Sequence, residues 1–248
     1  MTCDWAPLRA ALAACRHERV DVPLWWRDDD AVAPTPALDR LATLSERTGL
    51  PVHLAIIPAH VDATLAHSMD PARFIPVVHG WAHHNHSTGA DKKNEYLTPR
   101  DGAVAETGAA LAKMTSVFGN RLRPMFVPPW NRISDEVVQT LAAQGYTSLS
   151  TFGPRHHRQA ATGLSQINTH IDPIWWSGTR DLVPADQLIL QASRHITARA
   201  RGNEDKDEPL GLLTHHLVHT DAIWDFSVAF IQEMLEGGAA PWAMENDR

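Results

Sequence analysis

The stretch LWWRDDD, at residues 24–30, joins an apolar run to three adjacent carboxylates. The apolar run over residues 20–26 is typical of a β-strand, so Asp28, Asp29 and Asp30 follow directly on a strand. Three neighbouring carboxylates repel one another unless a cation or a proton relieves them. Catalytic side chains gather at the carboxyl ends of strands in barrels and in open α/β sheets. The stretch therefore predicts a strand that ends in a functional site.

Three other clusters stand at the same kind of position. HGWAH, at residues 79–83, follows a predicted strand over residues 74–78, and PPWN, at residues 128–131, follows one over residues 125–127. LTH, at residues 213–215, lies in an apolar run over residues 210–218. Acidic, imidazole and proline–aromatic clusters at several strand ends indicate one shared site more strongly than any single cluster does.

Predicted strands alternate with predicted helices about seven times along the chain. Further strands are expected over residues 52–57, 146–152 and 167–176, and helices over residues 1–16, 37–48, 61–67, 98–118, 134–144, 184–200 and 222–235. This alternation predicts an α/β protein with a mostly parallel sheet and right-handed crossovers. Closure of the sheet into a barrel would bring the strand ends into a ring, so that distant clusters can meet.

The composition narrows the class of protein. The 248 residues suit one α/β domain of barrel size, so we expect a single domain over residues 1–248. A net charge of −7 without a Lys/Arg-rich stretch argues against nucleic-acid binding. No stretch approaches the roughly 20 apolar residues of a membrane span, and residues 1–16 fit an amphipathic helix better than a signal peptide. We therefore expect a cytoplasmic protein without a membrane partner.

Two local features carry further expectations. Cys3 and Cys15 lack the CxxC spacing of zinc ribbons, and a bridge between two turns of one helix is not expected. The charged residues 201–208 show no hydrophobic periodicity, so this loop is expected to be disordered.

The chain contains 15 histidines, and imidazole is the commonest metal ligand in proteins. His79 and His83 are four residues apart, a spacing that places two imidazoles on one face of a helical turn. With one carboxylate of the Asp triplet they would leave positions open for water and substrate, and a neighbouring Asp could act as a general base. Exposed loop histidines and a solvated acidic turn are the alternatives. The apolar runs before both clusters favour the metal site.

The residues of the remaining clusters allow either a functional or a purely structural interpretation. His215 could protonate a leaving group, or be an exposed or hydrogen-bonded neighbour of the histidines that follow it. Trp130 could shape a pocket or only end its strand. Trp175 and Trp176 fit either a core or a sugar-stacking platform.

The order and spacing of the four clusters resemble the polysaccharide deacetylase superfamily, which comprises metal-dependent de-N-acetylases on a distorted (β/α)7 barrel, a TIM-barrel-like fold. The similarity covers residues 20–218. It implies that an Asp–Asp pair supplies first the general base and then a metal ligand. It also implies that His79 and His83 are the two histidine ligands, and that His215, two residues after Leu213, is the general acid. Leu213 is included among the substrate-binding residues.

The resemblance further implies that Pro129, Trp130 and Asn131 form one wall of the substrate groove. The family has Arg before this Pro-Pro pair, where this chain has Val127. Arg27 or Arg132 could replace that Arg as the cationic partner of the base.

The Asp triplet allows two registers, because the family's Asp-Asp-Gly is Asp28-Asp29-Asp30-Ala31 here. Divergent members carry Arg-x-Asp-Asp followed by an apolar residue. We therefore favour Asp29 as the base and Asp30 as the ligand, with Asp28 and Asp29 as the alternative pair.

These observations predict a cytoplasmic, metal-dependent hydrolase of amide C–N bonds that uses Zn²⁺ or a similar ion. The expected substrate is an N-acetyl sugar or a related small amide, either a small molecule or an oligosaccharide. One alternative is a hydrolase of a non-sugar amide, imide or ureide on the same scaffold. Another is a carbohydrate-binding relative that has lost the chemistry.

Overall fold

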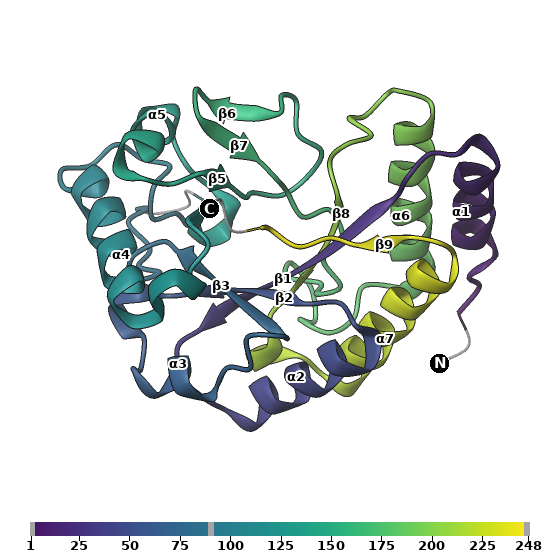
Figure 1. Ribbon diagram of the computed structural model, residues 1–248, viewed down its shortest axis with the longest axis horizontal. Helices are drawn as coiled ribbons and strands as arrows, with labels where there is room; N and C mark the ends of the chain where they lie inside the picture. Colours follow the sequence, from purple (N-terminus) through teal and green to yellow (C-terminus); the bar gives the residue numbers. More distant parts are fainter. Residues whose placement is uncertain (1–2, 89–91, 246–248) are drawn as a thin grey trace.

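The computed structural model describes residues 3–88 and 92–245, which form an α/β barrel with helices around its outside (Figure 1). Its parallel strands are β1 (Pro23–Ala31), β2 (Val52–Ile56), β3 (Phe74–His79), β4 (Met125–Val127), β5 (Ser148–Leu149), β7 (Leu164–Gln166) and β8 (Leu210–Thr214). They follow the order β7-β5-β4-β3-β2-β1-β8. The predicted parallel sheet is confirmed.

The barrel closes between β7 and β8 through an irregular segment. Isolated bridges join Phe152 to Thr169 and Ile171 to Leu212, and the N–H of Leu213 donates to the carbonyl of Ile171 at 2.8 Å. The side chain of Asn168 accepts from the N–H of Thr151 and donates to the carbonyl of Gly153. These side-chain bonds replace part of a regular ladder.

For this reason the strands expected over residues 146–152 and 167–176 are wrong in extent. Only Ser148–Leu149 of the first is regular, and the second contributes bridges without a continuous strand. The sequence also gave no indication of β7, which ends before the second expected strand begins, or of β6 (Gln159–Ala161), which pairs antiparallel with β7 in a short hairpin.

The predicted helices are present, with ends that agree or shift by up to five residues, although residues 1 and 2 of the first expected helix lie outside the described residues. They are α1 (Ala6–Glu18), α2 (Pro36–Thr48), α3 (Thr64–Ser68), α4 (Ala103–Phe118), α5 (Asp135–Gln144), α6 (Ala185–Ala200) and α7 (Asp221–Glu236). Three begin at a hydroxyl cap: the side chains of Thr35, Ser134 and Thr220 each accept a first-turn N–H. Within the described residues, no helix is long and apolar enough to cross a membrane.

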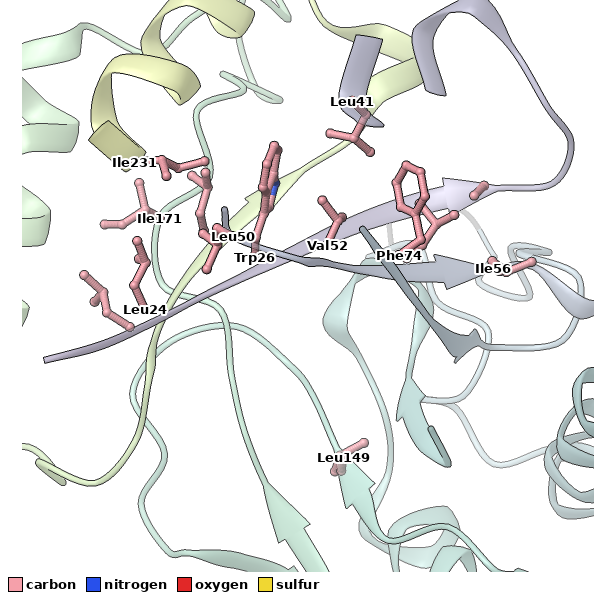
Figure 2. Packing of buried hydrophobic residues seen from close by; sticks show 14 of the residues in the cluster. Leu24, Trp26, Leu41, Leu50, Val52, Ile56, Phe74, Leu149, Ile171 and Ile231 are labelled. Carbon is pink, nitrogen blue, oxygen red and sulfur yellow. The ribbon is translucent and has the colours of Figure 1, made fainter. Parts of the chain in front are cut away.

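Alternating side chains of β1 face two different cores. Leu24 and Trp26 lie in the large cluster between the barrel and its helices, where Figure 2 shows Trp26 near Val52 and Leu41. Trp25 lies instead in the smaller cluster that fills the barrel interior. Because successive side chains of a strand point to opposite faces, Arg27 and Asp29 share the inward face of Trp25.

The end of the chain closes the opposite mouth of the barrel. β9 (Ala240–Pro241) pairs with Pro23 and Leu24, at the beginning of β1, and was not predicted. Trp242 stacks on the ring of His53, and the N–H of Met244 donates to His53 Nε2 at 3.0 Å. The Asp triplet lies at the other end of β1, so the bottom of the barrel is sealed away from it.

The loop expected to be disordered is ordered. Asp205 pairs with Arg155 at 2.8 Å, and the buried carboxylate of Glu208 accepts the N–H of Asn168 at 3.1 Å. Both carboxylates therefore have partners outside the loop, which a periodicity argument cannot detect. Cys3 and Cys15 are free thiols, as expected.

Because His53 is buried at this closed end of the barrel, we expect its contribution to the free energy of unfolding to depend on pH. Burial lowers the pKa of this imidazole to about 4, against 6.5 in an unfolded chain. Between these pH values the unfolded chain binds a proton that the folded chain does not. The free energy of unfolding should therefore fall by about 3 kcal/mol from this group as the pH drops through that window.

His53→Gln, which cannot titrate, should show a shallower pH dependence in urea unfolding between pH 7 and pH 4. His67→Gln, at an exposed position, is the control and should keep the wild-type slope. An unchanged slope in His53→Gln would contradict the prediction.

Candidate metal centre

The structure brings together Asp30, His79 and His83, the three residues predicted as metal ligands. One ligand atom from each lies within 4.8 Å of the others, a grouping found once among the described residues. Asp30 Oδ1 is 3.1 Å from His79 Nε2 and 3.3 Å from His83 Nε2. Two strands provide this convergence, because Asp30 lies near the end of β1 and His79 ends β3.

The geometry of these atoms fits a divalent ion. Ligands held about 2.1 Å from a tetrahedral ion lie about 3.4 Å apart, close to the two separations above. His79 Nδ1 donates to the carbonyl of Val127 at 2.9 Å, so its Nε2 carries the lone pair directed at the cluster. Such a hydrogen bond from the outer ring nitrogen is the usual way in which a ligand imidazole is oriented.

The charges of the cluster favour a bound cation. Burial opposes ionisation of Asp30, but the hydrogen bond and charge of His79 outweigh it and lower the pKa of Asp30. Burial disfavours protonation of His79, yet the charges of Asp29 and Asp30 raise its pKa. For His83, burial and the neighbouring His79 lower the pKa, which keeps this imidazole neutral. The negative charge that attracts a proton to His79 would equally attract a metal ion in its place, and one carboxylate with two neutral imidazoles is a donor set suited to Zn²⁺.

Several residues in this region have a left-handed backbone conformation. Asp30 has φ 75°, His83 φ 55°, and Trp130 and Asn131 each φ 57°. The pairing of β1 with β2 also shifts register between Asp28 and Ala31, as in a bulge. Non-glycine residues with positive φ cost free energy and concentrate at functional sites. The strain indicates that the contacts of these side chains at the strand ends offset the free-energy cost of their backbone conformation.

Asp29 lies on the inward face and is held by Arg27. The guanidinium donates Nε to one carboxylate oxygen at 2.9 Å and Nη2 to the other at 3.0 Å. The same group also donates to Ser150 Oγ and Asn131 Oδ1, each at 2.7 Å. Of the two arginines considered as a cationic partner, Arg27 is therefore the one that contacts Asp29, whereas Arg132 donates to the carbonyl of Lys93.

Asp28 points to the opposite face and is fully buried. His216 Nδ1 donates to it at 2.5 Å, and the hydroxyl of Thr214 at 2.6 Å. Burial opposes its ionisation, but the charge of His216 prevails and lowers the pKa of Asp28. The partners of Asp28 lie on β8 and the turn after it, so this carboxylate ties β1 to β8 away from the metal-ligand cluster.

His215 directly follows β8, whose last residue, Thr214, pairs in register with Asp28. Its ring packs edge-on with that of Trp176 at 4.8 Å between centroids, and its backbone N–H donates to His219 Nε2 at 3.0 Å. His215 Nδ1 is buried and has no hydrogen-bond partner within residues 3–88 and 92–245.

Asp172 was not assigned a role from the sequence, although it lies near this imidazole. Burial raises the pKa of Asp172, partly offset by the charge of His215. Its carboxylate accepts from Trp176 Nε1 at 2.8 Å. Its position in an irregular segment removed the strand-end signal that marked the other site residues.

The predicted substrate-binding residues surround the cluster in different ways. Trp130 lies 4.3 Å from the ring of His83 between centroids and is half-buried. Pro129 packs against the backbone of Gly80, and Asn131 orients Arg27. Leu213 is buried in β8 and pairs in register with Arg27, so its side chain shares the inward face of Arg27.

Comparison with known proteins identifies the class of fold. No protein-family model and no curated protein sequence matches the chain. Solved structures do match: a family 4 carbohydrate esterase from Streptomyces lividans, in complex with acetate, is 12% identical with a TM-score of 0.55 over 92% of this chain and 95% of that chain. The polysaccharide deacetylase Bc1974 from Bacillus cereus is 13% identical with a TM-score of 0.56, over 92% and 94%.

A family 4 pseudoenzyme from Bacillus anthracis also matches, at 16% identity and a TM-score of 0.55 over 89% of this chain and 63% of that chain. The chain therefore has the fold of the polysaccharide deacetylases, as its sequence motifs implied. Because a pseudoenzyme shares this fold, activity has to be argued from the site residues of this chain.

Gly80 offers a test of how tightly the site is built. At its φ of 55°, an added Cβ would lie 2.3 Å from Glu95 Oε2 and 2.6 Å from two ring carbons of Pro129. Gly80→Ala should cost about 1–2 kcal/mol of backbone strain and a further 1–3 kcal/mol, roughly, of overpacking. It should also weaken Zn²⁺ binding, because His83 follows three residues later.

Gly49→Ala is the matched control, since Gly49 has φ 68° and open space around an added Cβ. This variant should lose only the stability that the backbone strain costs, and it should bind Zn²⁺ as the wild type does. Urea unfolding and competition with a zinc-binding dye measure both quantities. Equal behaviour of the two variants would contradict the prediction.

Proposed function

We propose that this protein is a metal-dependent hydrolase of amide C–N bonds that deacetylates an N-acetyl sugar or a related small amide. The observation that carries the proposal is the convergence of Asp30, His79 and His83 beside a carboxylate, Asp29, fixed by a bidentate guanidinium. The fold shared with deacetylases from Streptomyces lividans and Bacillus cereus supports it.

Asp30, His79 and His83 would hold Zn²⁺ or a similar divalent ion. When bound, such an ion polarises the amide carbonyl and lowers the pKa of a water molecule. The residues fit this role, since both histidines direct Nε2 at one carboxylate oxygen.

Asp29 acts as the general base in this proposal. Its carboxylate takes a proton from the attacking water, whose oxygen adds to the carbonyl carbon. Arg27 holds both oxygens of Asp29, and Asn131 in turn orients Arg27, so the base keeps one fixed plane. A fixed base loses little conformational entropy as the reaction proceeds.

His215 acts as the general acid. In its protonated form it donates to the amide nitrogen as the C–N bond breaks, which releases the amine and leaves the acyl group as a carboxylate. The edge contact with Trp176 positions this side chain, and the backbone N–H of His215 donates to His219 Nε2, which holds the turn that carries it. The exposed face of Trp176, next to the acid, is suited to stack on a sugar ring.

Acetate release tests the proposed activity. The zinc-loaded protein should release acetate from chitooligosaccharides, and removal of zinc by a chelator should abolish this and lower the melting temperature. His79→Ala, assayed in parallel, should bind no zinc at micromolar concentrations. A wild-type protein that binds no divalent ion after titration would refute the proposal. Turnover of a cyclic ureide instead of the sugar would indicate the non-sugar alternative.

The three aspartates should separate by phenotype. Asp30→Asn should lose zinc, whereas Asp29→Asn should keep zinc and lose about 10²–10⁴-fold in kcat. Asp29→Asn should also lose stability, because it leaves buried Arg27 without its carboxylate partner. Asp28→Asn should keep zinc and kcat but lose roughly 3–5 kcal/mol of stability, because it leaves buried His216 without its carboxylate partner. Metal analysis, steady-state kinetics and urea unfolding distinguish the three outcomes. Full activity in Asp29→Asn would overturn this register.

A further inference from the structure

A buried carboxylate outside the ligand set organises the loop that carries His83. Glu95 is 1% exposed, although it lies in a polar stretch that gave no sequence signal. Its Oε1 accepts the N–H groups of Ala82 at 2.9 Å and His84 at 3.3 Å, and its Oε2 accepts that of Trp81 at 3.2 Å. Three amides of one turn therefore converge on a single anion.

This turn needs an anion because its backbone is irregular. Gly80 and His83 both have φ 55°, so the amides between and beside them cannot bond within a regular helix or strand. Successive N–H groups that point inward form a concave anion-binding nest. Buried amides without an acceptor would each lose the free energy of a hydrogen bond. The carboxylate of Glu95 accepts the hydrogen bonds of these amides and so lets the turn take a shape in which His83 reaches Asp30.

Glu95 is itself held in place by its neighbours. Arg100 Nε donates to its carbonyl at 3.2 Å, and the next residue, Tyr96, bridges to Ile133. The preceding residue, Asn94, receives a bond from the N–H of His86 at its carbonyl, at 2.8 Å. These contacts join residues 94–96 to Arg100, Ile133 and His86, so the backbone that carries the carboxylate is held in place.

The negative charge of Glu95 remains directed at the turn. Arg100, the nearest guanidinium bonded to this segment, places its Nη1 2.8 Å from Glu106 instead. Burial and the charge of His79 lower the pKa of His83, and the charges of Asp30 and Glu95 oppose this shift.

We propose that Glu95 is a positioning residue for the metal centre, which folds residues 80–84 so that His83 meets Asp30 and His79. This inference rests on the proposed metal site but concerns a residue that ligates nothing. It has two measurable parts: order in the turn without metal, and affinity for the metal.

Glu95→Gln tests both parts, because it keeps the size of the side chain and removes its charge and half of its acceptor capacity. In the metal-free protein, hydrogen exchange of the amides at residues 81–84 should accelerate about 10–100-fold, the loss expected for charge-assisted hydrogen bonds. Zn²⁺ affinity, from competition with a chelating dye, should fall about 10–100-fold. The absorption bands of the Co²⁺-loaded protein should change, which reports altered ligand geometry at His83.

Glu106→Gln is the matched control, since Glu106 pairs with Arg100 nearby but accepts nothing from residues 80–84. It should leave exchange, affinity and the Co²⁺ spectrum unchanged. Glu95→Asp keeps the charge on a shorter side chain and should give intermediate values. If Glu95→Gln does not fold, Glu95→Asp against the control decides.

Wild-type exchange and wild-type Zn²⁺ affinity in Glu95→Gln would overturn the inference. A wild-type protein without any affinity for divalent ions would instead refute the proposed function. In that case the exchange of residues 81–84 still decides whether Glu95 folds the turn.

Discussion

The bidentate ion pair between Arg27 and Asp29 is the interaction on which the centre of this barrel depends. Both residues are buried on the inward face of β1, and Arg27 also bonds to residues after β4 and β5. A buried guanidinium is tolerated only when its donors are paired, and removal of one partner costs about 3–5 kcal/mol. The pair thus holds three strands in one arrangement and fixes the plane of the proposed base.

Strand alternation divides the Asp triplet among separate tasks. Asp29 faces the interior, while Asp28 faces outward and ties β1 to β8 through His216. The register shift and the positive φ at Asp30 then turn the third carboxylate toward His79 and His83. Three like charges are compatible in adjacent positions because each has a different cationic or imidazole partner.

The sequence predicted much of the fold but little of its irregular part. Regular hydrophobic periods located β1 to β4, β8 and the main helices within a few residues. The segment after β7 was misjudged because Asn168 replaces ladder bonds with side-chain bonds. Glu95 and Asp172 escaped notice for a related reason: their roles come from burial and from partners that local patterns do not reveal.

The sequence by itself determined the class of fold and the residue types that meet at the strand ends, because hydrophobic period and strand-end position are local properties. Tertiary structure alone decided which aspartate faces which partner. Arg27 and Arg132 were equal candidates to accompany the proposed base until the barrel placed Arg27 against Asp29. The physical reason is that the partner of a buried charge is chosen by the geometry of chain closure, which no stretch of the sequence contains.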